Sequence, residues 1–433
     1  MLAVARNSWA LLLGILLLML GNGLQGTLLG VRGSAEGFST TSMSIVMSAY
    51  FVGFLGGSRL TPELIRRVGH VRVFAALASF ISAVLILYAA VPDPVAWALM
   101  RVVIGFCFSG VYVVAESWMN DASTNENRGK TMSLYLIVQM IGIVTAQGLL
   151  NVADPGGYNL FIISSVLVSI SVAPILLSVS PAPVFQRTKP MTLTRLFAVS
   201  PLGFVGMFLL GAIFSALFGM SAVFGAEIGL SVREISICVA AIYLGGMLFQ
   251  YPIGWASDRM DRRLLIVGLT AGGAIFAIGG AVFDGGFIWL LGLSFIIGGV
   301  ANPLYALYLA YTTDFLEIED MAAASGGLIF INGIGAISGP MILGWMMDKW
   351  GPYSYFVYIS SVLAAMAVYA VYRMTQRAAT PVEDTSSYAP LSPGLSPVAV
   401  EVAQEIAIEM ALEEENAEEN AEESNTEDTV DGA

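Results

Sequence analysis

The sequence has little charge and almost no histidine or cysteine. Only 12% of its 433 residues are Asp, Glu, Lys or Arg, against 57% apolar residues, and the mean hydropathy is +0.78. Soluble domains carry about 25% charged residues, so a soluble globular protein is excluded. One histidine, His70, and two cysteines, Cys107 and Cys238, argue against a histidine-based metal site and a dense disulfide framework. No cluster of catalytic residues stands out, so we predict neither an enzyme nor a bound cofactor.

The net charge of −13 belongs to the end of the chain. Residues 374–433 are rich in Asp and Glu and contain one basic residue, Arg377, whereas residues 1–373 are close to neutral. This acidic segment has too little apolar content to fold. We therefore predict a disordered tail, with at most a weak helix at residues 398–412. A docking role for the tail is the alternative to a solvated extension.

The rest of the chain consists of twelve apolar runs of membrane-spanning length. Each is near the roughly 20 residues that cross ~30 Å of hydrocarbon as a helix. Six runs fall in residues 1–179 and six in residues 201–373, with a cytoplasmic loop at residues 180–200 between them. The first run is too long for a secretory signal. We predict an all-α membrane protein with twelve transmembrane helices in two six-helix bundles.

The two halves repeat each other at an offset of 193 residues. Tyr50 recurs as Tyr243, and the same offset joins Gln139 to Asn332. Internal duplication in such a chain is typical of transporters, because a site between two similar halves can open to either side in turn. We predict that the two bundles are pseudo-symmetric and related by a parallel repeat.

Lys and Arg residues are divided unevenly between the two predicted sides of the membrane. If the N terminus is inside, the outer segments hold only Arg32, Arg233 and Lys349. Positively charged flanks are retained in the cytoplasm during insertion. We therefore predict a multi-pass protein of the inner or plasma membrane, with both termini, the central loop and the acidic tail in the cytoplasm.

The loop after the eighth apolar run carries the most specific motif, Gly-x-x-x-Asp-Arg-x-x-Arg-Arg at residues 254–263. It resembles the signature of the major facilitator superfamily, with Asp261 in place of a second glycine. The resemblance covers residues 1–373 and implies a loop whose charges hold the cytoplasmic side closed in one state and release it in another. A basic anchor that only fixes topology is the alternative. The gating candidates in this loop are Gly254, Asp258, Arg259 and Arg262.

The matching loop of the first half, residues 56–70, lacks the signature Asp. Ile65 stands at its place by the 193-residue offset, and Glu63 is the nearest acid. The loop is nevertheless basic, and in this it resembles the YcaD-like branch of the superfamily. The gating candidates of this half are Arg66, Arg67 and Arg128.

The fourth apolar run contains two ionisable residues, Arg101 and Glu116. A charge near the middle of a span costs about 2.5–3.5 kcal/mol, so its retention indicates a function. Arg101 begins an Arg-x-x-x-Gly sequence that resembles the family's fourth-helix motif, which implies a role in coupling or in recognition of substrate charge. Snorkelling to the membrane interface is the alternative. For Glu116 we expect a contact with Arg66 or Arg67 in the inner gate, with proton carriage or a solvated helix end as alternatives.

Polar residues inside other apolar runs are candidates for a central cavity. Amides at equivalent positions of both halves are what a pseudo-symmetric site at the midplane would show. Hydrogen bonding between packed helices, worth about 1 kcal/mol per residue, is the alternative. The cavity candidates are Asn22, Gln25, Tyr50, Tyr112, Gln139, Asn302, Tyr305 and Asn332.

One motif bears on the direction of transport. Gly333, Gly335, Gly339 and Pro340 lie in the eleventh run and resemble the Gly-Pro motif that drug efflux antiporters carry in the fifth helix, which favours export. No phosphate-binding loop of the Gly-x-x-x-x-Gly-Lys-Ser/Thr type is present, which argues against an ATP-driven pump.

We expect a secondary active transporter that moves a small solute by alternating access, with proton coupling left open. The competing interpretation is a membrane sensor or scaffold that has this fold without transport. We expect a monomer whose partners are the lipid bilayer and a small-molecule substrate, and we expect no nucleic acid partner.

Overall fold

The computed structural model describes residues 9–121, 125–177, 191–283 and 285–378, together with Pro381 and Tyr388. The predicted disorder of the tail and its weak helix at residues 398–412 lie outside these described residues. Within them, the regular structure is helical. Twelve of the helical segments are long and apolar enough to cross a membrane, and the predicted fold class is confirmed.

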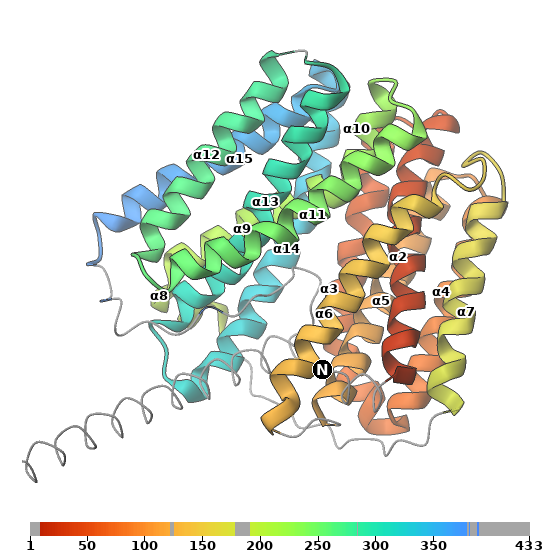
Figure 1. Cartoon of the computed structure of the whole chain (residues 1–433), viewed down its shortest axis with the longest axis horizontal. Helices are drawn as coiled ribbons and strands as arrows, with labels where there is room; N and C mark the ends of the chain where they lie inside the picture. The colour runs from red at the N-terminus through yellow and green to blue at the C-terminus, as the bar shows by residue number, and fades with distance from the viewer. Residues whose placement is uncertain are drawn as a thin grey trace, which may run out of the picture.

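The N-terminal half contains six long helices (Figure 1). They are α2 (Trp9–Ala35), α3 (Thr40–Val68), α4 (His70–Ala90), α5 (Pro94–Asp121), α6 (Asn125–Leu149) and α7 (Asn159–Leu177).

The C-terminal half repeats this arrangement, with its first long segment divided into three parts. These parts are α9 (Pro201–Ser215), the π-helix η1 (Ala216–Met220) and α10 (Ser221–Glu227). The other five helices are α11 (Val232–Ser257), α12 (Arg262–Val282), α13 (Gly286–Thr313), α14 (Ile318–Trp350) and α15 (Ser354–Met374).

Part of the predicted central loop is helical. Residues Leu193–Val199 form the short helix α8, whose first turn is capped by the Thr192 hydroxyl accepting from the Arg195 backbone N–H at 3.4 Å. The Arg195 guanidinium forms an ion pair with Asp320 at the start of α14. Residues 178–190 of the predicted loop lie outside the described residues. The described end of this segment thus contains a short helix, supported by the cap and the ion pair.

Close helix contacts in the two halves depend on glycines at matching positions. A Cβ atom added to Gly105 of α5 would lie 1.9 Å from the Tyr50 carbonyl oxygen of α3. A Cβ atom on Gly298 of α13, the repeat partner of Gly105, would lie 2.2 Å from the Ile242 carbonyl oxygen of α11. Small residues allow membrane helices to approach closely. The repeat thus preserves the same helix contact in both bundles.

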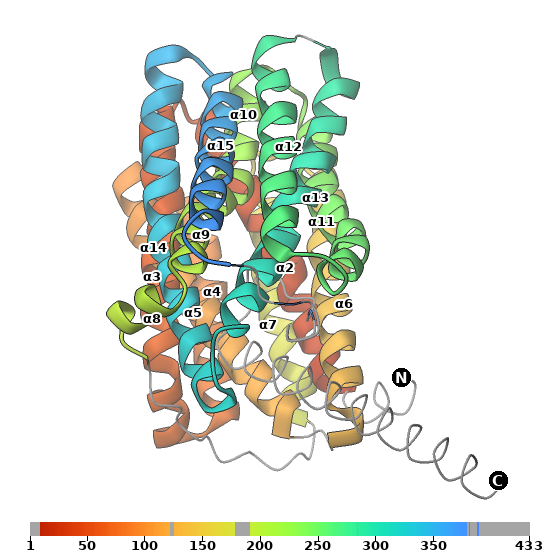
Figure 2. The same cartoon turned by 90° about the vertical axis from the view of Figure 1, so that its left-hand side faces the viewer.

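The two bundles meet mainly through α3 with α14, α2 with α10, and α6 with α11. We call the end where α2 begins the proximal end and the end where α2 finishes the distal end. Figure 2 shows the long helices running between these two ends. At the distal end, the Thr41 backbone N–H donates to Asp348 of α14 at 3.1 Å, and the Asn151 amide donates to the Ser236 hydroxyl at 3.0 Å. The halves are therefore joined at the distal end.

Candidate functional site

A cavity of about 180 Å³ lies between the two bundles. Helices α2, α3, α5 and α6 of the first half supply part of its wall, and α9, η1, α11, α13 and α14 of the second half supply the rest. The structure brings all eight polar residues of the predicted cavity to this one wall: Asn22, Gln25, Tyr50, Tyr112, Gln139, Asn302, Tyr305 and Asn332.

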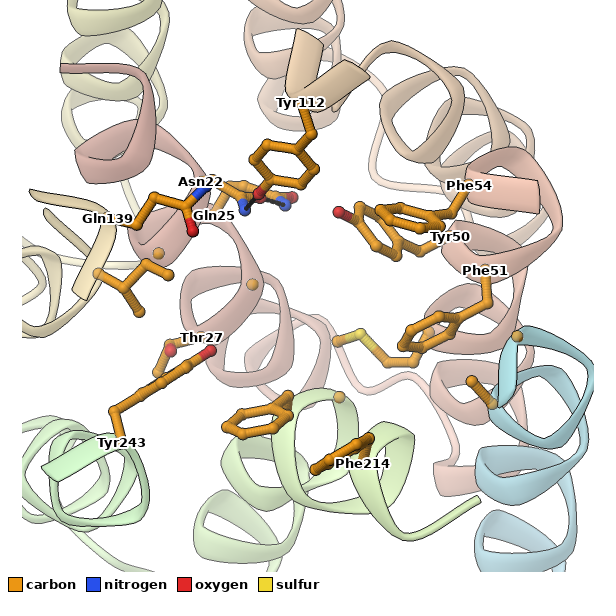
Figure 3. A pocket seen from close by; sticks show the side chains of 18 of the residues that line it. Asn22, Gln25, Thr27, Tyr50, Phe51, Phe54, Tyr112, Gln139, Phe214 and Tyr243 are labelled. Carbon is orange, nitrogen blue, oxygen red and sulfur yellow. Dashed lines mark hydrogen bonds between the residues drawn. The ribbon is translucent and has the colours of Figure 1, made fainter. Parts of the chain in front are cut away.

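Aromatic side chains form much of the remaining wall, and sequence reasoning missed the phenylalanines among them. Figure 3 shows Tyr50, Phe51 and Phe54 across the open space from Gln139, with Phe214 and Tyr243 at another side. Tyr243 carried a usable signal, because it is the repeat partner of the predicted residue Tyr50. The phenylalanines carried none, since phenylalanine is common on all faces of membrane helices.

The π-helix η1 borders the cavity. Phe218 and Gly219 lie in it and line the wall, as does Phe214 just before it. A π-helical turn inside an α-helix shifts the side chains that follow it, and such turns are frequent at functional sites. By the 193-residue offset, η1 corresponds to residues 23–27 of α2, and all of these except Leu24 also line the cavity.

The polar residues of the first half form a continuous chain of hydrogen bonds. Arg101 Nη1 donates to Gln25 Oε1 at 2.7 Å, and Gln25 Nε2 donates to Asn22 Oδ1 at 3.2 Å. Asn22 Nδ2 then donates to the Tyr112 hydroxyl at 2.8 Å. This series of hydrogen bonds links α2 to α5 at two positions, Arg101 and Tyr112. It also orients the Gln25 and Asn22 side chains, because each amide accepts through its oxygen and donates through its nitrogen.

The amides of the second half bind backbone instead. Asn332 Nδ2 donates to the Met207 carbonyl oxygen at 3.0 Å, and Asn302 Nδ2 donates to the Gly298 carbonyl oxygen at 2.9 Å. The Asn332 bond joins α14 to α9 and fits the helix-contact alternative, whereas the Asn302 bond lies within α13. Both residues also line the cavity. The side-chain network of the cavity is therefore concentrated in the first half.

Arg101 faces the cavity and not the membrane interface. Only 4% of its surface is exposed, and its guanidinium lies 5.1 Å from the centre of the Tyr50 ring. Its Nη2 donates to the Met47 sulfur at 3.1 Å. These contacts hold the charged group inside the first bundle, so the snorkelling alternative does not describe its position.

Glu116 is fully buried, and its neighbour Ser117 contacts His70 at 2.9 Å. The Tyr135 hydroxyl of α6 donates to Glu116 Oε1 at 2.9 Å. Arg66 and Arg67, which we expected near Glu116, bind Glu63 at 2.7 and 2.8 Å and are mostly exposed. The expected contact is wrong because Glu63 is one helical turn from both arginines and meets them at the surface. The burial of Glu116 also excludes a solvated helix end.

The signature loop is held by a buried arginine. Arg262 is 3% exposed; it forms an ion pair with Asp314 at the end of α13, and its Nη1 donates to the Ala310 carbonyl oxygen at 3.2 Å. Asp258 lies 3.7 Å from the same guanidinium. Arg259 extends over the Trp255 ring at 4.7 Å from its centre. Arg262 therefore joins the signature loop to α13. Of the other gating candidates, Arg128 belongs to α6, but its side chain is outside the described part.

Asp261, which replaces the signature glycine, begins helix α12. Its φ of −55° needs no glycine, and its side chain accepts from the Arg263 backbone N–H at 2.9 Å. Burial alone would raise the pKa of Asp261, but hydrogen bonds and the charge of Arg263 outweigh burial and hold that pKa below its usual value of 3.8. The substitution thus supplies a helix cap.

A second cavity, of about 500 Å³, adjoins the first on the proximal side. Met140, Tyr243 and Asn302 line both cavities. Helices α6 and α11 form most of the second wall, together with the signature loop and Tyr388. The Tyr388 backbone N–H donates to Asp258 Oδ1 at 2.9 Å. The central cavity is therefore bordered by open space toward the proximal end and by joined helices toward the distal end.

Comparisons with known proteins agree with this geometry. The chain is 26% identical over 363 residues to the "Uncharacterized MFS-type transporter YcaD" of Escherichia coli O17:K52:H18 (strain UMN026 / ExPEC), covering 82% of this chain and 93% of that protein. The fold is similar to the nucleoside transporter NupG (D323A mutant), with a TM-score of 0.74, 17% identity, and coverage of 84% of this chain and 99% of NupG. It is also similar to a D-xylose-proton symporter, with a TM-score of 0.65, 14% identity, and coverage of 84% and 96%. The model of the Major Facilitator Superfamily matches residues 11–231 and 203–404, and the chain belongs to this superfamily of integral multi-pass membrane transporters.

Proposed function

We propose that the protein is a secondary active transporter that moves one class of small solute by alternating access. The observation that carries the proposal is the cavity between two repeated bundles, lined by both. Such a site can be exposed to each side when one bundle rocks against the other. Its volume of about 180 Å³ is below the roughly 300–1,000 Å³ of pockets that bind drug-sized ligands, which favours a small solute.

The described conformation corresponds to loading from the proximal side. The proximal cavity beside α6 and α11 leads toward the central cavity, while Asp348 and Asn151 contribute contacts that join the halves at the distal end. The uneven distribution of Lys and Arg assigns the proximal side to the cytoplasm. Import and export both pass through a conformation open to the cytoplasm, so the proposed direction, export, is supported by the Gly-Pro motif at residues 333–340.

Proton coupling is proposed to use Glu116. A buried carboxylate can bind or release a proton when its surroundings change between two conformations. Glu116 has no exposed surface, and Tyr112, one helical turn away, lies in the cavity wall. A proton on Glu116 could therefore change the hydrogen bonding of α5 next to the solute.

The test is flux through the full-length protein in proteoliposomes. Vesicles are loaded with a mixture of small neutral, anionic and cationic solutes, and their release is followed by mass spectrometry with and without a pH gradient. Release above that of protein-free vesicles for at least one solute is the expected result. A protein that releases none of them would support the sensor or scaffold interpretation instead.

A further inference from the structure

Arg101 carries a buried positive charge that no carboxylate neutralises in the part of the chain that the structure describes. Its contacts are the Gln25 side-chain oxygen, the Met47 sulfur and the face of the Tyr50 ring. Its Nε atom is buried and has no hydrogen-bond partner among the described residues. An uncompensated buried charge costs several kcal/mol. A bound anion would supply both the missing counter-charge and an acceptor for the Arg101 Nε–H group.

The open hydrogen-bonding positions of Arg101 lie on one edge of its guanidinium. Nε and Nη2 point the same way and can bind the two oxygens of a carboxylate through parallel N–H···O bonds. Nε is unpartnered, and Nη2 is occupied only by the Met47 sulfur at 3.1 Å, which is a weak acceptor on a flexible side chain. Gln25 binds the remaining nitrogen, Nη1, and fixes the plane of the group.

The rest of the cavity wall suits an apolar body attached to such an anion. Arg101 is the one Asp, Glu, Lys or Arg residue among the residues that line the cavity. Aromatic rings from both halves, including Phe51, Phe54, Phe214 and Phe218, supply apolar faces. A neutral or cationic solute would leave the guanidinium without a counter-charge.

We propose that the cavity binds a small organic anion, whose carboxylate is held by the Nε and Nη2 edge of Arg101 and whose body contacts the aromatic wall. This inference rests on the proposed transport function and adds the class of substrate. Met47 must turn aside when the anion binds, because its sulfur covers part of that edge.

The test uses matched probes with the full-length protein in detergent. Calorimetric titration compares benzoate with benzamide and hexanoate with hexanamide, because each pair differs mainly in charge. We expect at least one acid to bind about tenfold or more tightly than its amide, the usual contribution of a charge-assisted hydrogen bond pair. Absence of this preference in both pairs overturns the inference.

Variants connect the preference to Arg101. Arg101→Gln should abolish the preference for acid over amide, and Arg101→Lys should retain the preference but bind the acid more weakly, because a lysine lacks the two-pronged edge. Arg59→Gln is the matched control, since Arg59 is exposed and contacts Phe330 outside the cavity. If Arg101→Gln does not fold, Met47→Ala decides: uncovering the edge should leave acid binding as tight or tighter, and weaker acid binding contradicts the proposal.

The flux assay separates this inference from the transport proposal. Release of neutral or cationic solutes, without acid preference in the titrations, would overturn the anion inference and leave transport standing. Acid preference without release of any solute would overturn transport and leave an anion-binding membrane protein.

Discussion

Glu116 lies one helical turn from a residue of the cavity wall, Tyr112. Its carboxylate is buried in the first bundle and accepts from Tyr135 on the next helix. Tyr112 precedes it by one helical turn and ends the hydrogen-bond chain that begins at Arg101. A change in the charge of Glu116 would therefore act one turn away from the solute.

We predict that Glu116→Gln uncouples transport from protons. Glutamine keeps the acceptor for Tyr135 but cannot titrate. Accumulation of solute driven by a pH gradient should fall to the level seen without a gradient, while exchange of solute at equal pH continues. Proteoliposome flux with and without the gradient measures both. The control is Asp93→Asn, an exposed acid of the same half that accepts from the Ala96 backbone N–H at 2.8 Å. Gradient-driven accumulation at the wild-type level in Glu116→Gln would exclude this role.

Of the residues that line the cavity, only the polar ones could be predicted from the sequence. Asn22 and Gln139 stand out in the sequence because an amide inside an apolar run needs a partner. Phe54 lines the cavity, whereas Phe80 is 59% exposed on the outside of the bundle, and nothing local distinguishes them. Which face a phenylalanine occupies is set by helix packing, and packing depends on contacts far apart in the chain.

At the scale of elements, the helices could be predicted and their irregularities could not. The twelve apolar runs agree with the twelve membrane-length helices because length and hydropathy determine a span. The π-helix at residues 216–220 and the short helix α8 were missed. Helix α8 is capped by the Thr192 side chain, and a single cap leaves only a weak trace in composition. The π-helix has no side-chain cap, and no residue type in the sequence marks it.

The start of helix α12 offers a stability prediction. Asp261→Ala removes the cap on the Arg263 backbone N–H and the ion pair with its side chain, and should cost about 1 kcal/mol of stability. Because the pKa of Asp261 is lowered on folding, this contribution is present at neutral pH and is lost as the pH falls through the lowered pKa. Thermal denaturation in detergent at pH 7 measures the cost, with Asp261→Asn as the control that keeps the cap. Equal stability of the alanine variant and the wild type would contradict a capping role.

Tyr388 offers a prediction about the proximal opening. Its ring lies against Gly254, where an added Cβ would be 2.6 Å from the tyrosine Cδ1 atom, and its backbone binds Asp258. It thereby lines the space between α6 and α11, which closes in the proposed alternating-access cycle. We expect Tyr388→Ala to raise the transport rate by a few fold, with Tyr372→Ala, an exposed tyrosine of α15, as the control. A lower or unchanged rate in Tyr388→Ala would show that this contact does not restrain closure.

For the whole molecule, the sequence repeat predicts two bundles but not which end is open. Both conformations of an alternating-access protein arise from one sequence, so their relative stability depends on contacts between the halves. In this structure Asp348 and Asn151 supply polar contacts at the distal end, and the cavity of about 500 Å³ separates α6 from α11 toward the proximal end. Opening the distal end therefore requires breaking these hydrogen bonds and separating α3 from α14 and α2 from α10.

A reversible lock on the distal end tests whether this opening is part of transport. In a background with Cys107→Ala and Cys238→Ala, the pair Asn151→Cys and Ser236→Cys replaces a 3.0 Å hydrogen bond between the halves with a disulfide. Flux in proteoliposomes should fall to the protein-free level on oxidation and recover on reduction, because the two bundles can no longer separate at this end. The control pair, Ser82→Cys and Ser165→Cys, replaces a 2.7 Å contact within the first half and should leave flux unchanged in both redox states. Continued solute flux when the disulfide between positions 151 and 236 is fully formed would mean that the bundles do not separate at this end. Rocking of one bundle against the other about this interface would then be excluded as the mechanism.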